Sequence, residues 1–248
     1  MYDFSTRYAV VTGAAQGIGF AAAKRFVEEG IAGIAILDWN GEMAATAGEE
    51  LAAMGSSKVL ALKCDVSDYK MTESVMKKIE AEFGRVDILF NNAGVTQDAM
   101  FHKMTLEQWN SVIGVNLQGV FNCTRTVING MRNRKYGRII NMASKSVYGE
   151  VGQANYAATK AAMVGLTKTL AKEGARKGIT ANAILPDFIN TPMMAAIPEE
   201  NMKMRLAQAP MQRMGEVSEV AALVVWLASD ESSYVNGDCI DVNGATRT

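Results

Sequence analysis

The stretch Tyr8-Ala9-Val10-Val11-Thr12-Gly13-Ala14-Ala15-Gln16-Gly17-Ile18-Gly19 decides the fold of this chain. It opens with a short apolar run that is typical of a buried strand, and the residues from Phe20 to Glu29 that follow it are mostly helix formers. A strand, a glycine-rich turn and a helix in this order bring bare backbone N–H groups and a helix N-terminus against a phosphate. The stretch therefore favours a dinucleotide site over an ordinary loop.

Each glycine of the turn has a physical task. Gly13 permits the tight turn, Gly17 lets the backbone approach a pyrophosphate, and Gly19 allows the helix to pack closely on the strand. We expect the following turn residues to contact a dinucleotide: Gly13, Gln16, Gly17, Ile18 and Gly19.

The rest of the chain alternates between short apolar runs and longer amphipathic segments, which predicts a parallel sheet covered by helices on both faces. Strands are expected near 8–12, 33–38, 58–63, 86–90, 137–142, 179–184 and 238–242. Helices are expected near 17–30, 42–54, 69–83, 105–133, 155–176 and 216–229. With right-handed crossovers the 248 residues form one α/β domain with a doubly wound sheet of about seven strands.

Polar residues follow several of these strands. Asp38 ends the second, Asn91 follows the fourth, Ser144 follows the fifth and Pro186-Asp187 follows the sixth. The carboxyl ends of parallel strands meet at one edge of a sheet, where such folds bind their ligands. We therefore expect the chemistry of the chain at this edge.

A tyrosine and a lysine four residues apart occur in Tyr156-Ala157-Ala158-Thr159-Lys160, twelve residues after Ser144. Residues i and i+4 share one face of a helix, so an ammonium would lie beside a phenol. A free phenol has a pKa of about 10, and a neighbouring positive charge lowers it. Many Tyr–Lys pairs at this spacing are only solvated surface pairs, but the glycine turn favours acid–base chemistry at a carbonyl or alcohol.

Together these motifs resemble the short-chain dehydrogenase/reductase family over nearly the whole chain. The motifs that carry the resemblance occur in the family's order: the Thr12–Gly19 turn, Asp65-Val66, Asn91-Asn92-Ala93-Gly94, Asn116, Ser144, Tyr156 and Lys160. Residues 92–98 and 152–156 are most similar to bacterial 3-oxoacyl-thioester reductases, although hydroxysteroid and polyol dehydrogenases share much of this pattern. The resemblance implies a Rossmann-type fold and a nicotinamide-dependent oxidoreductase.

The resemblance also implies catalytic roles. Tyr156 would protonate a substrate oxygen, Ser144 would hold that oxygen, and Lys160 would lower the pKa of Tyr156 and bind the nicotinamide ribose. Asn116 would hold a water that links Lys160 to solvent. The family places its serine most often thirteen residues before the tyrosine, where this chain has Ala143, so Ser146 is the alternative to Ser144.

Asp38 indicates which cofactor is used. A carboxylate at the end of the second strand accepts hydrogen bonds from the adenosine ribose and repels a 2′-phosphate. Gln16 stands where NADP-dependent relatives often carry arginine, so we predict NAD(H) over NADP(H). By resemblance, further contacts come from Asp65 and Val66 to the adenine, Asn92 and Gly94 to the central portion, and Ile189 and Thr191 to the nicotinamide amide. The family commonly has Pro-Gly where this chain has Pro186-Asp187.

The substrate expected from the resemblance is a 3-oxoacyl thioester, and an NAD-dependent dehydrogenase of a hydroxysteroid, polyol or other secondary alcohol is the alternative. Lys135 and Lys177 match basic positions of relatives that meet an acyl carrier protein, although both also read as ordinary exposed helix ends. Residues 187–214 contain three prolines and six methionines, which favours a mobile lid over an apolar substrate. A homotetramer is expected through residues 105–133, 155–176 and the C-terminal strand.

Composition argues against other classes of protein. The net charge is −1, so no overall field would attract nucleic acid or an anionic membrane. The longest strongly apolar stretch, residues 220–228, is far shorter than the ~20 residues of a membrane span, and a cytoplasmic enzyme without signal peptide is expected. Three scattered cysteines and a single histidine, His102, predict no metal site. A cofactor-binding scaffold without catalysis is disfavoured by the complete set of catalytic residues.

Overall fold

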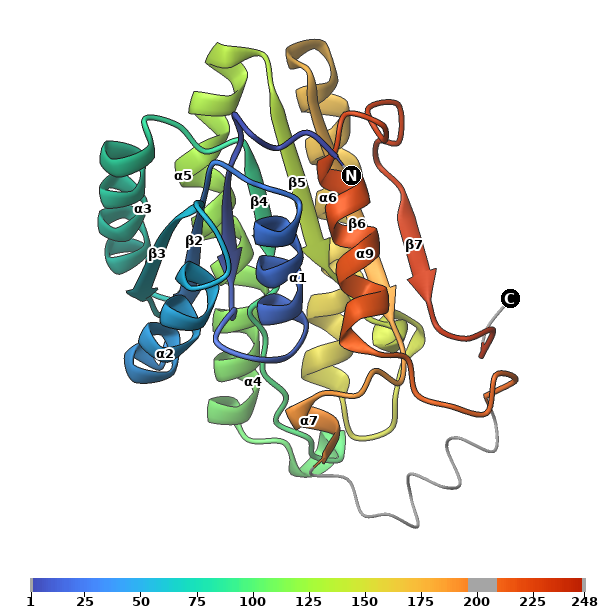
Figure 1. The fold of residues 1–248 in the computed structure, drawn as a ribbon. Coiled ribbons are helices and arrows are strands. Elements are labelled where there is room, and N and C mark those ends of the chain that lie inside the picture. The colour runs from blue at the N-terminus through green and yellow to red at the C-terminus, as the bar shows by residue number, and fades with distance from the viewer. Residues whose placement is uncertain (1, 196–208, 247–248) are drawn as a thin grey trace.

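The computed structural model describes residues 2–195 and 209–246, and it contains one parallel sheet of seven strands (Figure 1). The strands are β1 (Tyr8–Thr12), β2 (Gly33–Asp38), β3 (Lys58–Lys63), β4 (Ile88–Asn91), β5 (Gly137–Met142), β6 (Ile179–Pro186) and β7 (Cys239–Val242). Their order is β3-β2-β1-β4-β5-β6-β7, so the chain changes direction across the sheet between β1 and β4. The predicted doubly wound sheet is confirmed.

Two layers of helices cover this sheet (Figure 1). One layer holds α1 (Gly17–Glu28), α2 (Gly41–Ala52) and α9 (Val217–Ala228). The other holds α3 (Tyr69–Phe83), α4 (Leu106–Ile113), α5 (Gly119–Arg134) and α6 (Ala154–Gly174). Short helical turns lie at η1 (Phe101–Lys103), η2 (Gly114–Gln118), η3 (Lys145–Tyr148), η4 (Ala175–Lys177) and α7 (Pro192–Ala195).

Both faces of the central strands are buried, which explains why these strands read as unbroken apolar runs. All six residues of β2 are buried. Successive side chains of a strand point to opposite faces, so Ile34 and Ile36 join the core under α1 and α9, whereas Ala35 and Leu37 join the core under α3 and α5.

The register of β1 and β4 brings the glycine turn to the predicted edge. Their pairing runs from Ala9 opposite Ile88 to Val11 opposite Phe90. The two strands then leave the sheet side by side, β1 into the turn at Gly13 and β4 into Asn92. The change of strand order therefore places both cofactor motifs together, as open α/β sheets generally do.

The predicted helix over 105–133 is interrupted. A π-helical segment, η2, separates α4 from α5 and contains Asn116, which is 1% exposed. Hydrophobic periodicity predicts helix for α4, η2 and α5 alike. It cannot distinguish an α-helical turn from a π-helical turn, which contains one extra residue. Such turns occur frequently at functional sites.

The middle of the predicted lid at 187–214, residues 196–208 with Met202 and Met204, lies outside the described residues. On either side of this gap the chain forms α7 and a parallel bridge between Ile189 and Gly215. The lid stays a prediction.

None of the described helices is both long and apolar enough to cross a membrane. All three cysteines carry free thiols; Cys64 and Cys123 are buried and Cys239 is half-buried. Within residues 2–195 and 209–246 no three His, Cys, Asp or Glu side chains are grouped to hold a metal ion.

The packing of Gly19 yields the first testable prediction. A Cβ at this position would collide with the Gly13 carbonyl oxygen and the Asn92 side chain. Gly19→Ala should therefore lower the free energy of unfolding by about 1–3 kcal/mol, the usual cost of overpacking. Gly55→Ala is the matched control, because the nearest atom to its Cβ would lie 3.9 Å away, and it should change stability by less than about 0.5 kcal/mol. If urea unfolding showed an equal loss of unfolding free energy in the two variants, the packing argument would be contradicted.

Candidate active site

The glycine turn has the backbone expected of it. Gly13 and Gly17 have φ of +60° and +61°, values that side chains rarely tolerate. A Cβ at Gly13 would lie 2.8 Å from the Ala93 Cα, whereas a Cβ at Gly17 would meet nothing nearer than Pro192 at 3.8 Å. Gly13 therefore serves the turn itself, and Gly17 leaves open room where the backbone N–H groups begin helix α1. These residues fit a bound pyrophosphate.

Two polar side chains hold this turn against the end of β4. The Asn92 Nδ2 donates hydrogen bonds of 2.9 Å to the carbonyl oxygens of Thr12 and Gly13, and the Thr12 Oγ1 accepts 3.0 Å bonds from the Asn92 and Ala93 N–H groups. Asn92 thus shapes the cofactor turn, in addition to the direct contact that the resemblance implies. Thr12 is a positioning residue that the sequence analysis did not single out, although a threonine at the last position of a strand before a glycine turn is the available signal.

Asp38 lies beside the turn at the end of β2. Its carboxylate accepts hydrogen bonds from the Ala15 N–H at 3.2 Å and the Asn40 N–H at 3.1 Å, and only 9% of the residue is exposed. The acid is thereby held at the place predicted for the adenosine ribose. Gln16 is exposed at the start of α1, and Ile18 is half-buried against the core.

Asp65 and Val66 follow β3 but differ in their surroundings. Asp65 is exposed, and its Oδ1 accepts hydrogen bonds from the backbone and hydroxyl of Ser67. Val66 is 6% exposed and packs so closely on Gly119 that a Cβ there would lie 2.6 Å from the valine Cγ2. The packing role of Val66 is evident, and both adenine contacts stay predictions.

The predicted serine and tyrosine lie close together beyond the carboxyl end of β5. Ser144 is the N-cap of η3, and its Oγ accepts a 3.2 Å hydrogen bond from the Ser146 N–H. Its side chain lies close enough to the Tyr156 phenol to lower the pKa of that phenol. The alternative, Ser146, is buried, and its hydroxyl has no partner within the described part of the chain. This geometry favours Ser144.

Lys160 lies one turn below Tyr156 on α6 and is 3% exposed. Its ammonium donates a 2.5 Å hydrogen bond to the Met142 carbonyl oxygen at the end of β5, and its Nζ lies 5.4 Å from the centre of the Tyr156 ring. Burial lowers the pKa of Lys160 to about 8. The i, i+4 pairing of the two residues is confirmed.

The direction of the Tyr156 pKa differs from the prediction. Burial raises the pKa of Tyr156, the hydrogen bond with Ser144 lowers it in part, and the charge of Asp98 adds to the rise. The prediction of a lowered pKa is wrong for this arrangement, because burial of the phenol outweighs the lowering by Ser144, and the Lys160 ammonium donates its hydrogen bond to the Met142 carbonyl. The phenol therefore keeps its proton at neutral pH, as an acid must.

Asn116 joins the lysine to the loop after β4. Its side-chain amide pairs with the backbone of Val95, accepting a 2.8 Å bond from the N–H and donating a 3.0 Å bond to the carbonyl. A Cβ at Gly94 would lie 3.4 Å from the Asn116 Oδ1 and 3.7 Å from the Lys160 Nζ. Gly94, Asn116 and Lys160 are thus brought together, while the water-holding role of Asn116 stays a prediction.

Asn155 is a second positioning residue that the sequence analysis missed. It is fully buried, donates to the Gln97 and Gln108 carbonyl oxygens at 3.0 and 3.2 Å, and accepts from the Tyr156 N–H at 2.8 Å. These bonds fix the start of α6, and with it the backbone of Tyr156. Its place directly before the tyrosine is the only signal in the sequence.

The residues predicted to flank the nicotinamide follow β6. The Thr191 methyl would lie 4.0 Å from a Cβ at Gly17, so this segment reaches the glycine turn. Ile189 is 4% exposed. Asp187 does not have a positive φ, so its backbone does not require glycine at this position. Its carboxylate instead lies 2.8 Å from the Lys145 ammonium.

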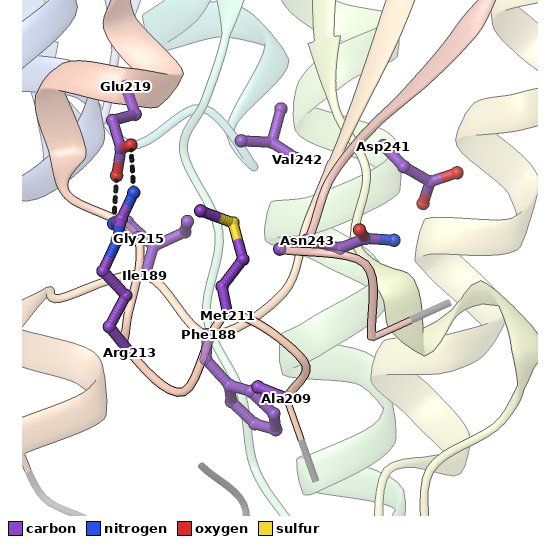
Figure 2. Close-up of a pocket in the computed structure, with 11 residues that line it drawn as sticks. Phe188, Ile189, Ala209, Met211, Arg213, Gly215, Glu219, Asp241, Val242 and Asn243 are labelled. Carbon is purple, nitrogen blue, oxygen red and sulfur yellow. Dashed lines mark hydrogen bonds and ion pairs between the residues drawn. The ribbon is translucent and has the colours of Figure 1, made fainter. Parts of the chain in front are cut away.

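A cavity of about 280 Å³ adjoins the segment that follows β6 (Figure 2). Figure 2 shows the Arg213–Glu219 ion pair at one side of it and Asp241 and Asn243 at the other, with Met211 between them. Ile189 contributes to its wall, but none of the four predicted catalytic residues does. The cavity is therefore separate from the Tyr156 site.

The two lysines predicted to meet a carrier protein lie far from this site. Lys135 and Lys177 precede β5 and β6, whereas Ser144 and Asp187 follow the same strands. The six residues of β5 alone span about 20 Å. A protein docked on Lys135 and Lys177 would therefore sit at the opposite edge of the sheet from Tyr156 of the same chain.

Comparisons with known proteins show which family the chain is similar to. A family model described as Enoyl-(Acyl carrier protein) reductase matches residues 13–245. The chain is 46% identical over 245 residues to the acetoacetyl-CoA reductase of Shinella zoogloeoides, covering 96% of this chain and 98% of the relative. It is 42% identical to the 3-oxoacyl-[acyl-carrier-protein] reductase of Escherichia coli, covering 98% of both chains.

Two solved structures share the fold. The crystal structure of levodione reductase superposes with a TM-score of 0.94 at 33% identity, covering 98% of both chains. That of 3-oxoacyl-[acyl-carrier protein] reductase from Brucella melitensis ATCC 23457 gives a TM-score of 0.92 at 36% identity, covering 97% of this chain and 91% of the other.

The burial of Lys160 predicts a stability cost that depends on pH. Its pKa of about 8 in the folded chain lies below the ordinary 10.5, so below about pH 8 the folded chain carries the full cost of a buried ammonium. Between pH 8 and 10.5 the unfolded chain binds more protons, and this cost diminishes as pH rises. Lys160→Met should therefore be more stable than the parent by about 1–3 kcal/mol at pH 7, and by less near pH 10.

Denaturant unfolding at both pH values measures this difference. Lys168→Met, which removes an exposed lysine from the same helix, serves as the control and should change stability by less than about 0.5 kcal/mol. A Lys160→Met variant that is less stable than the parent at pH 7 would show that the ammonium stabilises the fold.

Proposed function

Because the chain belongs to the short-chain dehydrogenase/reductase family, we propose that it transfers a hydride between a nicotinamide cofactor and the 3-oxo group of an acyl thioester. The observation that carries this proposal is the placement of the Ser144 side chain close enough to the Tyr156 phenol to lower its pKa, with the Lys160 ammonium 5.4 Å from the centre of the same ring. The names of relatives at 42–46% identity over almost the whole chain support the substrate class.

The cofactor is held by the residues that shape the turn. The backbone from Gly13 to Gly19 would hold the pyrophosphate at the N-terminus of α1, and Asp38, which is bonded to the Ala15 N–H, would accept hydrogen bonds from the adenosine ribose. When bound, the nicotinamide supplies the hydride. The room above Gly17 and the closeness of Gly94 to the Lys160 ammonium indicate where the central portion would lie.

The protein's part in the reaction is to hold and move one proton. In the reductive direction Tyr156 carries the proton on its phenol oxygen and donates it to the substrate oxygen, while the Ser144 hydroxyl holds that oxygen in place. The raised pKa of Tyr156 keeps this proton available at neutral pH. The Lys160 ammonium provides a positive charge next to the phenolate that is left behind.

The proton role of Tyr156 is tested by removing its hydroxyl. Tyr156→Phe should lower kcat for acetoacetyl-thioester reduction by at least about 100-fold, the usual range for a lost general acid, and leave NADH binding largely unchanged. Tyr234→Phe, at a fully exposed tyrosine, should retain parental turnover. Substantial turnover by Tyr156→Phe would show that another group acts as the general acid.

NAD(H) is the proposed cofactor, because Asp38 is held by backbone N–H groups at the adenosine end and would lie against a 2′-phosphate. Like charges brought together cost several kcal/mol, so kcat/KM for NADH should exceed that for NADPH by at least about tenfold. Asp38→Asn should narrow this ratio by raising kcat/KM for NADPH. A preference of the parent chain for NADPH would refute the proposal.

A second function has one specific observation in its favour. The fold matches levodione reductase with a TM-score of 0.94, and that name denotes a reductase of a different compound. An NAD-dependent dehydrogenase of a hydroxysteroid, polyol or other secondary alcohol is therefore the alternative. A panel of oxo-thioesters, steroids and polyols, assayed with both nicotinamides, separates the two by comparing kcat/KM.

The proposal also covers the form of the thioester substrate and the oligomeric state of the chain. The opposite-edge position of Lys135 and Lys177 favours a small acyl thioester over one delivered by an acyl carrier protein to the same chain. We retain the homotetramer through α4, α5, α6 and β7, and the cytoplasmic location, as expectations of the family resemblance.

A further inference from the structure

Asp187 is one of the positions at which this chain departs from the family pattern, and its side chain has several partners in the structure. Its side chain is 1% exposed. Its Oδ1 lies 2.8 Å from the Lys145 Nζ, and its Oδ2 accepts a 2.5 Å hydrogen bond from the Thr246 hydroxyl. Its own N–H donates to the Val242 carbonyl oxygen at 3.2 Å. A buried carboxylate with this many partners is part of a built network.

Lys145 connects this network to the catalytic segment. It follows Ser144 directly and begins η3. Its ammonium also lies 4.0 Å from the centre of the Phe188 ring. Two consecutive residues at the end of β6 thus hold Lys145 from two sides, one by charge and one by a cation–π contact. The position of η3 relative to β6 is set by these contacts in addition to the backbone bond from the Ala143 N–H to the Ile184 carbonyl.

A strained turn near the C-terminus reaches the same carboxylate. Gly244 and Ala245 both have positive φ, +58° and +66°, and the Thr246 N–H donates to the Asn243 carbonyl oxygen at 3.1 Å. Positive φ is rare for alanine and costs on the order of 1 kcal/mol or more. Such a conformation persists where surrounding contacts over-determine it. Here Asn243 accepts a hydrogen bond from the Ala245 N–H, and the Thr246 hydroxyl is bound to Asp187.

We propose that Asp187 is a positioning residue that links the C-terminal turn to the catalytic serine: through Lys145 it holds η3 so that the Ser144 hydroxyl faces Tyr156. This inference rests on the proposed function. A displacement of about 1 Å of a substrate-positioning group can lower a rate by two orders of magnitude, so an anchor one residue from Ser144 affects the chemical step.

Four variants of the ion pair test the proposal. Asp187→Asn removes the charge but keeps the shape and an acceptor for Thr246, and it should lower kcat for acetoacetyl-thioester reduction about tenfold with little change in the KM for NADH. Lys145→Met should lower kcat similarly, and the double variant should be no slower than the slower single variant, because both remove one interaction. Lys145→Arg keeps the ion pair and should restore kcat. Glu82→Gln breaks the Lys58–Glu82 pair remote from the site and should leave kcat unchanged.

A kcat for Asp187→Asn within about twofold of the parent would overturn the proposal, as would additive losses in the double variant. Lower thermal stability with an unchanged kcat would show that the network serves the fold alone. That outcome would also overturn the positioning role.

A measurement without substrate separates this inference from the proposed function. Hydrogen exchange at residues 143–149 reports the order of η3, where the Val147 and Gly149 N–H groups donate to the Ser144 and Ser146 carbonyls. Exchange should become faster in Asp187→Asn and Thr246→Val, but not in Glu82→Gln. If the parent chain reduces no 3-oxoacyl thioester, the proposed function fails while this experiment still decides whether Asp187 orders the serine segment. Unchanged exchange in both variants would refute the link.

Discussion

The hydrogen bonds between Asn92 and the backbone of Thr12 and Gly13 are the constraint on which the rest of this molecule depends. They lie where the strand order reverses, between β1 and β4. Two loops from distant parts of the chain come together there because Gly13 and Gly19 carry no side chain that would displace the Ala93 backbone or the Asn92 amide. The cofactor turn takes its shape from this contact, and the loop that leads to Asn116 and the catalytic end of α6 starts from it.

Burial of the Lys160 ammonium in the candidate active site lowers the stability of the fold. Lys160 is buried with a single strong hydrogen bond, to a backbone carbonyl, and no carboxylate is paired with it in the described contacts. Burial acts on the two neighbours in opposite directions, keeping the proton on Tyr156 and loosening it from Lys160. Perturbed groups of this kind cluster at functional sites, where stability is exchanged for reactivity.

Most of the fold could be predicted from the sequence, because short apolar runs alternate regularly with longer amphipathic segments. The Tyr156–Lys160 pair and the glycine turn are local patterns; the spacing of the pair gained weight only from the strand–turn–helix context and the family resemblance. What failed depends on three-dimensional surroundings: the π-turn around Asn116, the direction of the Tyr156 pKa and the partners of Asp187. Thr12 and Asn155 were missed as positioning residues because their bonds reach segments more than forty residues away in the sequence.

The π-turn between α4 and α5 makes the length of this region critical. An α-helix turns by about 100° per residue, so deleting one residue there would rotate everything beyond it by that angle. The Asn116 amide would then leave the Val95 backbone, whose N–H and carbonyl it now satisfies. We therefore expect this helical segment to tolerate substitution far better than insertion or deletion.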